Sequence, residues 1–275
     1  MNKVYLADNL TVLKELDSES IDLIYIDPPF NTKKKRSLTH LKTEQSESGD
    51  RTGFQDKRYT TTKGKTRAYE DTFFDYLGFL EPRIIECHRI LKTGGSFFLH
   101  LDYREVHYAK VLTDTIFSRD CFINEIIWSF DYGARSKKKW SVKHNNILWY
   151  AKDPKYYTFN YDQMDRLPYL APGLVGKEKA KRGKTPTDSW WGTIVPTNSK
   201  ERKNYPTQKP LWLLERIIKI HSNPGDIILD CFAGAGTTGE AAVKNGREFI
   251  MIDDNKEAVE IMQKRFAEYG ISIID

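Results

Sequence analysis

The sequence is poor in cysteine and contains no long apolar run. Its 275 residues include three cysteines, Cys87, Cys121 and Cys231, which lie far apart. No CxxC pair or zinc-like spacing connects them with the six histidines, so we expect neither a disulfide framework nor a metal site. No apolar stretch approaches membrane-spanning length, and no signal peptide is recognisable at the start of the sequence. These features predict a cytoplasmic protein with no membrane partner.

The charge of the chain is modest in sum and uneven in distribution. The formal net charge is +5, but residues 31–70 hold eleven Lys or Arg against five acids, and residues 135–209 hold seventeen against six. Clustered cations without an amphipathic anchor indicate nucleic acid as the partner, although simple solvated loops would also carry them. The hydrophobic content of 39% suffices at this length for one α/β core.

Strand and helix patterns alternate at both ends of the chain. The run "IDLIYI" at 21–26 is apolar on both faces, as expected for a strand covered by helices on both sides. This alternation continues to about residue 130 and returns from residue 205. The pattern predicts a doubly wound α/β fold with a mixed, mostly parallel sheet of the Rossmann-like class.

Two segments interrupt this alternation. Residues 31–70 are rich in Ser, Thr, Gly and Lys without apolar periodicity, which predicts a long, mobile basic loop that is disordered without DNA. Residues 131–204 consist of aromatic and basic pieces and are predicted to form an inserted region. Residues 1–130 and 205–275 would then be the two halves of one domain.

The strand at 21–26 ends in the tetrapeptide "DPPF". Proline cannot continue a central strand, so this sequence predicts a stiff turn that presents a carboxylate and an aromatic ring. The plain alternative is a proline turn that merely ends the strand. The four residues of the turn are Asp27, Pro28, Pro29 and Phe30.

The stretch "ILDCFAGAGTTGEAA" predicts a ligand-binding turn. A strand ends at Asp230, Gly234 and Gly236 allow the backbone to pass close to a ligand, and a helix begins near Thr237. The next strand ends at Asp253, which could hydrogen-bond ribose hydroxyls. Together these features predict an adenosine-containing ligand. Close packing would also explain the glycines, and an N-cap or a solvated acid would explain Asp253.

The two motifs resemble those of a known enzyme family. "DCFAGAGTT" is similar to the cofactor motif of S-adenosylmethionine-dependent methyltransferases, and "DPPF" is similar to the catalytic tetrapeptide of those that methylate exocyclic amines. With the catalytic motif first, the chain resembles the β class of amino DNA methyltransferases, of the restriction-modification type. The likeness includes residues 89–112 and 205–226. It implies a class I methyltransferase fold, S-adenosylmethionine as cofactor, double-stranded DNA as substrate, and a cognate restriction endonuclease and a homodimer as candidate partners.

The resemblance implies a role for each matching residue. The Asp27 carboxylate and the Pro28 carbonyl would accept hydrogen bonds from the target amino group, Pro29 would stiffen the turn, and Phe30 would stack on the flipped base. The implied cofactor-binding residues are Asp8, Thr207, Gln208, Lys209, Asp230, Phe232, Gly234, Gly236, Thr237 and Asp253.

Two of these assignments have plain alternatives. Asp8 would approach the cofactor's adenine, but it could instead only cap the helix expected at 10–16. Lys209 lies in the segment expected to line the methionine end of the cofactor, but it could instead be a surface cation.

DNA contacts are expected from two segments. Four cations directly after the catalytic turn are placed to bind phosphates around a flipped nucleotide. The inserted region 131–204 matches the target-recognition region of the family in position. Its Trp140, Trp190 and Trp191 could equally be core residues of a small domain. The four cations are Lys33, Lys34, Lys35 and Arg36.

The motifs favour an enzyme that methylates adenine N6 in double-stranded DNA. Asp27 favours adenine, because the cytosine-N4 relatives, which are the first alternative, more often carry Ser there. Adenine-N6 methylation of structured RNA is a second alternative, against which stand the motif order and the basic insert. A nonenzymatic nucleic-acid-binding protein is a third, and the intact Asp27 and glycines argue against it.

Overall fold

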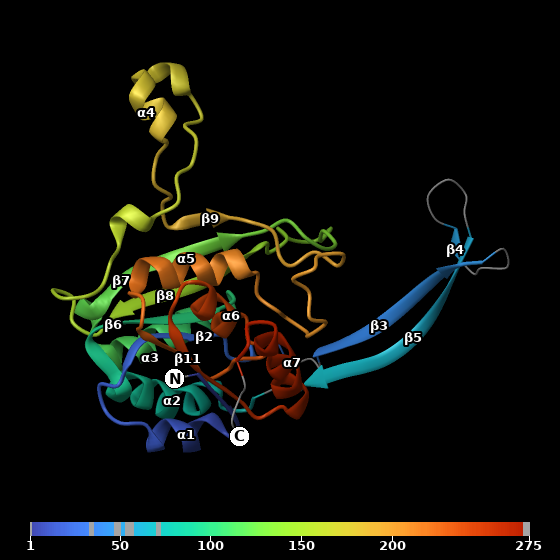
Figure 1. Ribbon diagram of the computed structural model, residues 1–275, viewed down its shortest axis with the longest axis horizontal. Helices are drawn as coiled ribbons and strands as arrows, with labels where there is room; N and C mark the ends of the chain where they lie inside the picture. The colour runs from blue at the N-terminus through green and yellow to red at the C-terminus, as the bar shows by residue number, and fades with distance from the viewer. Residues whose placement is uncertain (1, 33–35, 47–50, 53–57, 70–72, 272–275) are drawn as a thin grey trace.

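A single large sheet forms the centre of the molecule (Figure 1). The computed structural model describes residues 2–32, 36–46, 51–52, 58–69 and 73–271. The strands of the large sheet are β1 (Lys3–Leu6), β2 (Ile21–Ile26), β6 (Leu91–Leu101), β7 (Phe122–Ser129), β8 (His144–Ala151), β9 (Ser189–Trp191), β10 (Ile227–Asp230) and β11 (Glu248–Asp253). Their order is β1-β11-β10-β2-β6-β8-β7-β9, and within this sheet β8 runs against its neighbours while the other paired strands are parallel. The predicted mixed, mostly parallel sheet is confirmed.

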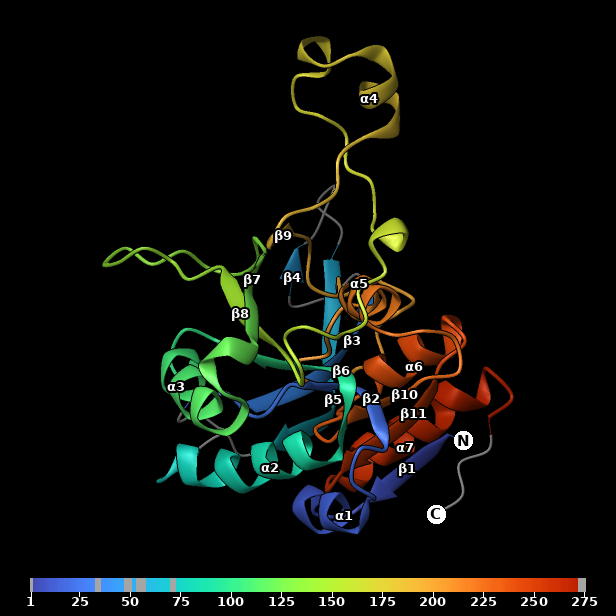
Figure 2. The same ribbon diagram turned by 90° about the vertical axis from the view of Figure 1, so that its left-hand side faces the viewer.

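Helices cover both faces of this sheet (Figure 2). One face carries α1 (Asn9–Glu15), α2 (Tyr76–Ile90) and α3 (Val106–Phe117). The other face carries α5 (Leu211–His221), α6 (Thr237–Lys244) and α7 (Lys256–Ala267). In the parts of the chain that the structure describes, no helix is long and apolar enough to cross a membrane.

β2 shows why both faces have to be covered. Ile24 and Ile26 are buried against the first group of helices, and Leu23 and Tyr25 against the second. Successive side chains of a strand point to opposite faces, so an all-apolar strand needs cover on both. Full burial of side chains of this size contributes about 1.5–3 kcal/mol each.

The topology brings the two predicted motifs together. β2 and β10 are parallel neighbours, with Leu23 opposite Ile228 and Ile24 opposite Leu229. Because parallel strands end at the same edge of a sheet, Asp27, which follows β2, and Asp230, which ends β10, emerge side by side. Strands from the two ends of the chain are thus neighbours in one sheet.

The segment 31–70 contains a small sheet of its own. The prediction of a loop without regular structure is wrong for its described part, which extends from the body as an antiparallel ribbon of order β3-β5-β4, with strands β3 (Arg36–Gln45), β4 (Arg51–Thr52) and β5 (Arg58–Tyr69) (Figure 1). The sequence reading relied on apolar periodicity, whereas Thr and Tyr in "RYTTTKGKTRAY" favour strands without an apolar face. Residues 33–35, expected to contact DNA, lie outside the described residues.

The inserted region 131–204 does not form a unit separate from the sheet. β8 belongs to the region by sequence yet lies between β6 and β7 in the sheet. The part that projects from the body carries α4 (Lys177–Arg182) (Figure 1). Trp190 is buried, as predicted for a core residue, but Trp140 is 97% exposed and Trp191 is 73% exposed, so the core reading is wrong for these two.

Candidate active site

The proline turn after β2 faces a cavity of about 370 Å³. Asp27, Pro28, Pro29 and Phe30 all line this cavity. The ring of Phe30 lies 5.9 Å, centroid to centroid, from the buried imidazole of His100. Because the prolines lack backbone donors and fix their φ angles, the turn holds its carboxylate and ring in a restricted geometry. The turn therefore does more than end a strand, since it presents polar and aromatic groups to a cavity.

Residues 231–236 form the turn between β10 and α6, the expected cofactor turn. Asp230 shapes this turn from beneath. Its side chain is almost fully buried, with Oδ1 accepting from the Phe232 amide at 3.0 Å and Oδ2 accepting from Thr238 Oγ1 at 2.6 Å. Burial raises the pKa of Asp230 to about 7, against the effect of these two hydrogen bonds and helped by the charges of Asp27 and Asp253. The carboxyl group thus ties the end of β10 to the first turn of α6.

The two glycines of the turn have different roles, one in packing and one at the cavity wall. Gly234 has a φ of 50° and Gly236 a φ of 71°, both in the left-handed region that favours glycine. A Cβ on Gly236 would lie 2.6 Å from Met262 Cγ, so this glycine is needed for close packing, the plain alternative. Gly234 and its neighbour Tyr205 instead line the cavity. The expected helix start at Thr237 is confirmed.

Asp253 ends β11 beside this turn. Its Oδ2 accepts from the Gly234 amide at 2.7 Å and its Oδ1 accepts from the Asn255 amide at 2.9 Å. The N-cap of α7 is Asn255, so Asp253 is not the cap. Burial raises the pKa of Asp253 to about 6. Each carboxylate oxygen has two lone pairs, so Asp253 can still accept hydrogen bonds from ligand hydroxyls at the cavity.

Asp8 caps α1 and also lines the cavity. Its Oδ1 accepts from the Thr11 amide at 3.2 Å as the N-cap of α1, and its Oδ2 lies 3.0 Å from Arg83 Nη2. Arg83 also donates through Nε to Asn9 Oδ1 at 2.6 Å. Asp8, Asn9 and Arg83 all line the cavity. The sequence reading missed Arg83, although a cation on the apolar face of an amphipathic helix is a detectable signal.

Lys209 is not a surface cation. It is 91% buried, and its Nζ forms an ion pair with Asp27 Oδ2. The same ammonium lies 3.3 Å from the Thr207 carbonyl and 5.2 Å from the centroid of the Phe30 ring. The lysine ammonium therefore lies at the catalytic turn.

Gln208 braces the loop that carries Lys209. Its Nε2 donates to the Glu201 carbonyl at 2.8 Å, and its Oε1 accepts from the Lys203 amide at 2.8 Å. The Glu201 carboxylate accepts in turn from the Leu211 amide at 2.6 Å, at the first residue of α5. Gln208 also lines the cavity, but its amide is engaged with the protein backbone.

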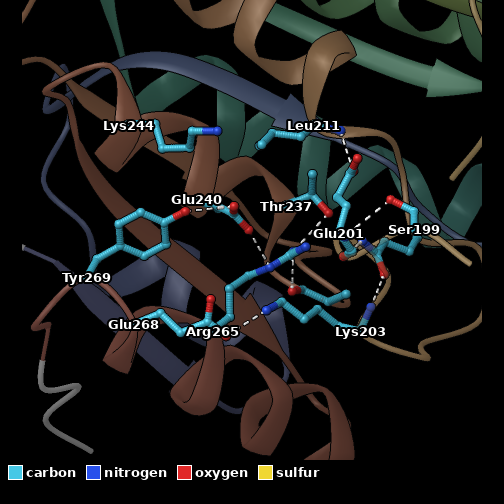
Figure 3. A network of polar contacts seen from close by, with 12 residues as sticks. Ser199, Glu201, Lys203, Leu211, Thr237, Glu240, Lys244, Arg265, Glu268 and Tyr269 are labelled. Carbon is cyan, nitrogen blue, oxygen red and sulfur yellow. Dashed lines mark hydrogen bonds and ion pairs between the residues drawn. The ribbon is translucent and has the colours of Figure 1, made fainter.

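A network of polar contacts supports the cofactor turn from behind (Figure 3). Arg265 is fully buried, and its Nη1 donates to the Ala235 carbonyl at 2.6 Å and to Thr237 Oγ1 at 3.0 Å. Its Nε lies 2.7 Å from Glu240 Oε2. The Thr237 hydroxyl, at the start of α6, is thus held by Arg265. Sequence reasoning missed this arginine, which lies far from both motifs.

A buried polar chain lies beneath the catalytic turn. The hydroxyl of Tyr25 lies 2.6 Å from His100 Nδ1, and Asn145 Nδ2 lies 3.0 Å from His100 Nε2. Burial lowers the pKa of His100 well below its usual value, and the charge of Lys209 lowers it further, so the imidazole is neutral. These side chains link β2, β6 and β8. The signal in the sequence is a histidine inside the apolar run "FFLHL".

The cavity residues fit an adenosine-containing cation. Carboxyl groups stand at several points of the wall, aromatic rings from Phe79 and Phe232 supply apolar surface, and the glycine turn lets the backbone approach. Cavities of this volume are typical of small-molecule sites. Within the described parts of the chain, no group of three or more His, Cys, Asp or Glu could hold a metal ion.

Comparison with known proteins gives consistent matches. The DNA methylase family profile (N6_N4_Mtase) matches residues 21–264. The chain is 33% identical to "DNA adenine methyltransferase YhdJ" of Escherichia coli (strain K12), over 94% of this chain and 80% of that protein. It is 32% identical to "Type II methyltransferase M.HpaI" of Haemophilus parainfluenzae, over 94% of this chain and 72% of that protein.

Solved structures share the fold. PvuII DNA methyltransferase (cytosine-N4-specific) gives a TM-score of 0.65 at 19% identity, covering 99% of this chain and 89% of that chain. The M1.HpyAVI–SAM complex gives a TM-score of 0.57 at 23% identity, covering 96% of this chain and 100% of that chain. From its sequence matches, the chain belongs to the N6-adenine/N4-cytosine family of DNA methylases, whose methyl donor is S-adenosylmethionine.

Proposed function

We propose that this protein transfers the methyl group of S-adenosylmethionine to N6 of adenine in double-stranded DNA. The observation that carries the proposal is the shared cavity. The Asp27–Phe30 turn after β2 and the glycine turn after β10 line the same cavity, because the two strands are parallel neighbours. A methyl donor bound at one turn would therefore lie next to an acceptor bound at the other.

The catalytic turn suits an exocyclic amine. The lone pair of an adenine amino nitrogen is delocalised into the ring, so the group needs hydrogen-bond acceptors that favour a more pyramidal, electron-rich nitrogen. The Asp27 carboxylate and the Pro28 carbonyl would accept from its two N–H groups, with little reorganisation because the prolines stiffen the turn. Bound S-adenosylmethionine supplies the methyl group, and the turn orients the nitrogen for in-line attack.

The target base would have to leave the duplex to reach the cavity. Base flipping costs roughly a few kcal/mol, and stacking on Phe30 would offset part of that cost. Lys33, Lys34, Lys35 and Arg36 would bind the phosphates around the flipped nucleotide. The exposed, basic parts of the region 131–204 would supply target recognition.

Two observations favour adenine over cytosine. The first residue of the tetrapeptide is Asp27, whereas cytosine-N4 relatives more often carry Ser there. The relative in Escherichia coli is named a DNA adenine methyltransferase. Cytosine N4 is the remaining alternative, because both bases offer an exocyclic amine to the same acceptors. The cofactor residues proposed for this reaction are Asp8, Thr207, Gln208, Asp230, Phe232, Gly234, Gly236, Thr237 and Asp253; Lys209, also expected among them, pairs with Asp27 instead.

The partners and the location of the protein are also proposed from its family. The Haemophilus relative is named a type II methyltransferase, which supports a cognate restriction endonuclease for this protein. A homodimer is the proposed assembly, by analogy with the class, and the cytoplasm is the proposed location.

The test is methyl transfer from labelled S-adenosylmethionine to unmethylated genomic DNA, followed by nucleoside digestion and mass spectrometry. N6-methyladenine would support the proposal, and sequencing of the modified sites would give the recognition sequence. N4-methylcytosine would overturn the choice of base and keep the chemistry. The matched control is Asp27→Ala, which should abolish transfer and largely preserve cofactor binding. Loss of cofactor binding as well would mean that Asp27 is structural.

A further inference from the structure

Asp27 and Lys209 form a buried ion pair between distant parts of the chain. They are 182 residues apart in sequence, and their side chains are only 15% and 10% exposed. Asp27 belongs to the turn after β2, whereas Lys209 belongs to the loop that precedes α5. Removing both charges from water is costly, so a pair of this kind needs a compensating role.

The surroundings of Asp27 are rich in acids. Asp230 ends the neighbouring strand, and the charge of Asp27 contributes to the raised pKa of that carboxyl group. Arg83, another buried cation at the cavity, pairs with Asp8. Among the described residues, the titratable or charged ones that share the cavity wall or the floor beneath it with Asp27 are Asp8, Tyr25, Arg83, His100, Tyr205, Lys209, Asp230, Cys231, Asp253 and Asp254.

We propose that Lys209 is a positioning residue for methyl transfer, which keeps Asp27 ionised and fixes the orientation of its carboxylate. This inference rests on the proposed function, because it assigns Asp27 the task of accepting a hydrogen bond from the substrate amino group. An ionised carboxylate is an acceptor only, whereas a protonated one gains a donor and can bond the amino group with the wrong polarity. Burial and negative neighbours favour protonation, and an adjacent cation opposes it.

The structure holds the ammonium in place from several sides. The Thr207 carbonyl accepts from Lys209 Nζ, and the Phe30 ring lies within cation–π range. Thr207 has a φ of 61°, and Gln208 is tied to the backbone of Glu201 and Lys203. The cation is therefore preorganised by the loop and does not have to be recruited by the substrate.

The first test measures single-turnover methylation from pH 5 to pH 9 at saturating cofactor, with Lys209→Met and Lys209→Arg as matched variants. We expect Lys209→Met to slow transfer by roughly 100-fold, comparable to the loss of one preorganised electrostatic contact. The acidic limb of its pH–rate profile should move to higher pH by about one unit or more. Lys209→Arg should return the limb towards the wild-type position, because it restores the charge.

Cofactor affinity separates this role from plain cofactor binding. In equilibrium dialysis with labelled S-adenosylmethionine, Lys209→Met should change the Kd by less than about threefold. A loss of affinity as large as the loss of rate, with the acidic limb unmoved, would make Lys209 a cofactor ligand and overturn the proposal.

A second measurement needs no substrate. Thermal unfolding of Lys209→Met is compared at pH 5.5 and pH 8.5 with that of the double variant Asp27→Asn/Lys209→Met. Without the Lys209 ammonium the buried Asp27 carboxyl favours its protonated form more strongly, so the single variant should lose stability as pH rises. Breaking a buried pair should lower Tm at pH 8.5 by about 5–10 °C more than at pH 5.5, and Asp27→Asn should remove this difference.

These readouts distinguish the two proposals. If the wild-type protein does not methylate DNA, the proposed function fails, while the unfolding data still decide whether Lys209 compensates the charge of Asp27. The inference is overturned, even if methylation is observed, if Lys209→Met lowers Tm equally at both pH values and the double variant has the same Tm as the single variant.

Discussion

Asn31 joins the catalytic turn to the start of α3. Its Nδ2 donates to Glu105 Oε1 at 2.8 Å, and its Oδ1 accepts from the Phe73 amide at 3.0 Å. Asn31 directly follows Phe30, is buried, and has a φ of 50°. One side chain thus ties together the point where the chain leaves the catalytic turn and the point where it returns to the body after the β3–β5 ribbon.

Removing the Asn31 side chain should disturb Phe30 without affecting the cofactor turn. We expect Asn31→Gly, which keeps the left-handed backbone accessible, to cost about 1–3 kcal/mol through two lost buried hydrogen bonds. Asn31→Ala should cost about 1 kcal/mol more, because alanine is strained at this φ. Transfer should fall at least tenfold in both variants with cofactor affinity unchanged. Denaturant unfolding and dialysis measure these effects, and equal stability of the two variants would contradict the backbone argument.

Asp230 should make stability depend on pH in a defined direction. Its pKa in the folded state, about 7, lies above the ordinary value near 3.9 of an unfolded chain. The folded protein therefore holds this proton more tightly than the unfolded chain. The stabilisation that comes from protonated Asp230 is fully present below pH 4 and is lost as pH rises towards 7. Asp230→Asn should remove it, and the wild-type minus variant difference in unfolding free energy should fall by a few kcal/mol between pH 4 and pH 8. If the difference in unfolding free energy between wild type and variant does not change with pH, the raised pKa of Asp230 is contradicted.

The sequence predicted what depends on local patterns. The strand before Asp27, the glycine turn after Asp230 and the helix start at Thr237 all follow from apolar runs, prolines and glycines, whose effects act within a few residues. The sheet edge that unites them follows from the rule that parallel strands end on one side.

Contacts between distant residues could not be predicted in the same way. Lys209 reaches Asp27 across 182 residues, and Arg265 reaches the carbonyl of Ala235 across 30 residues. Neither contact has a periodic signature, because each depends on how helices and loops pack in three dimensions. The β3–β5 ribbon was missed for a different reason, since its strands carry β-favouring Thr and Tyr without an alternating apolar face.

Arg265 should affect both stability and cofactor affinity. Arg265→Met leaves the buried Glu240 without its cation and the Ala235 carbonyl without its donor, which should cost about 3–5 kcal/mol. The loosened turn should bind S-adenosylmethionine at least tenfold more weakly. Arg89→Met is the matched control, because Arg89 also pairs with a glutamate and donates to backbone carbonyls, but it does not line the cavity. The control should lose stability only, and an unchanged Kd in Arg265→Met would show that the network does not support the turn.

Two sets of four cations can be compared as DNA contacts. The first set, 33–36, follows the catalytic turn after Asn31 and Thr32, and the second set is exposed on the projecting helix α4. Changing either set to Gln lowers the net charge from +5 to +1, so any long-range effect of charge is the same in both variants. The second set consists of Lys177, Lys179, Lys181 and Arg182.

We expect the first variant to bind a duplex on the order of 100-fold more weakly at 0.1 M salt, because direct phosphate contacts are lost. The slope of log K against log salt should become less steep by about 0.9 for each phosphate contact removed, hence by up to about 3.6. Fluorescence anisotropy over a salt series measures both quantities, with Tm and cofactor affinity expected to remain unchanged. A greater loss in the α4 variant would move the main phosphate contacts to the region 131–204, and equal small losses would mean that neither set touches phosphate.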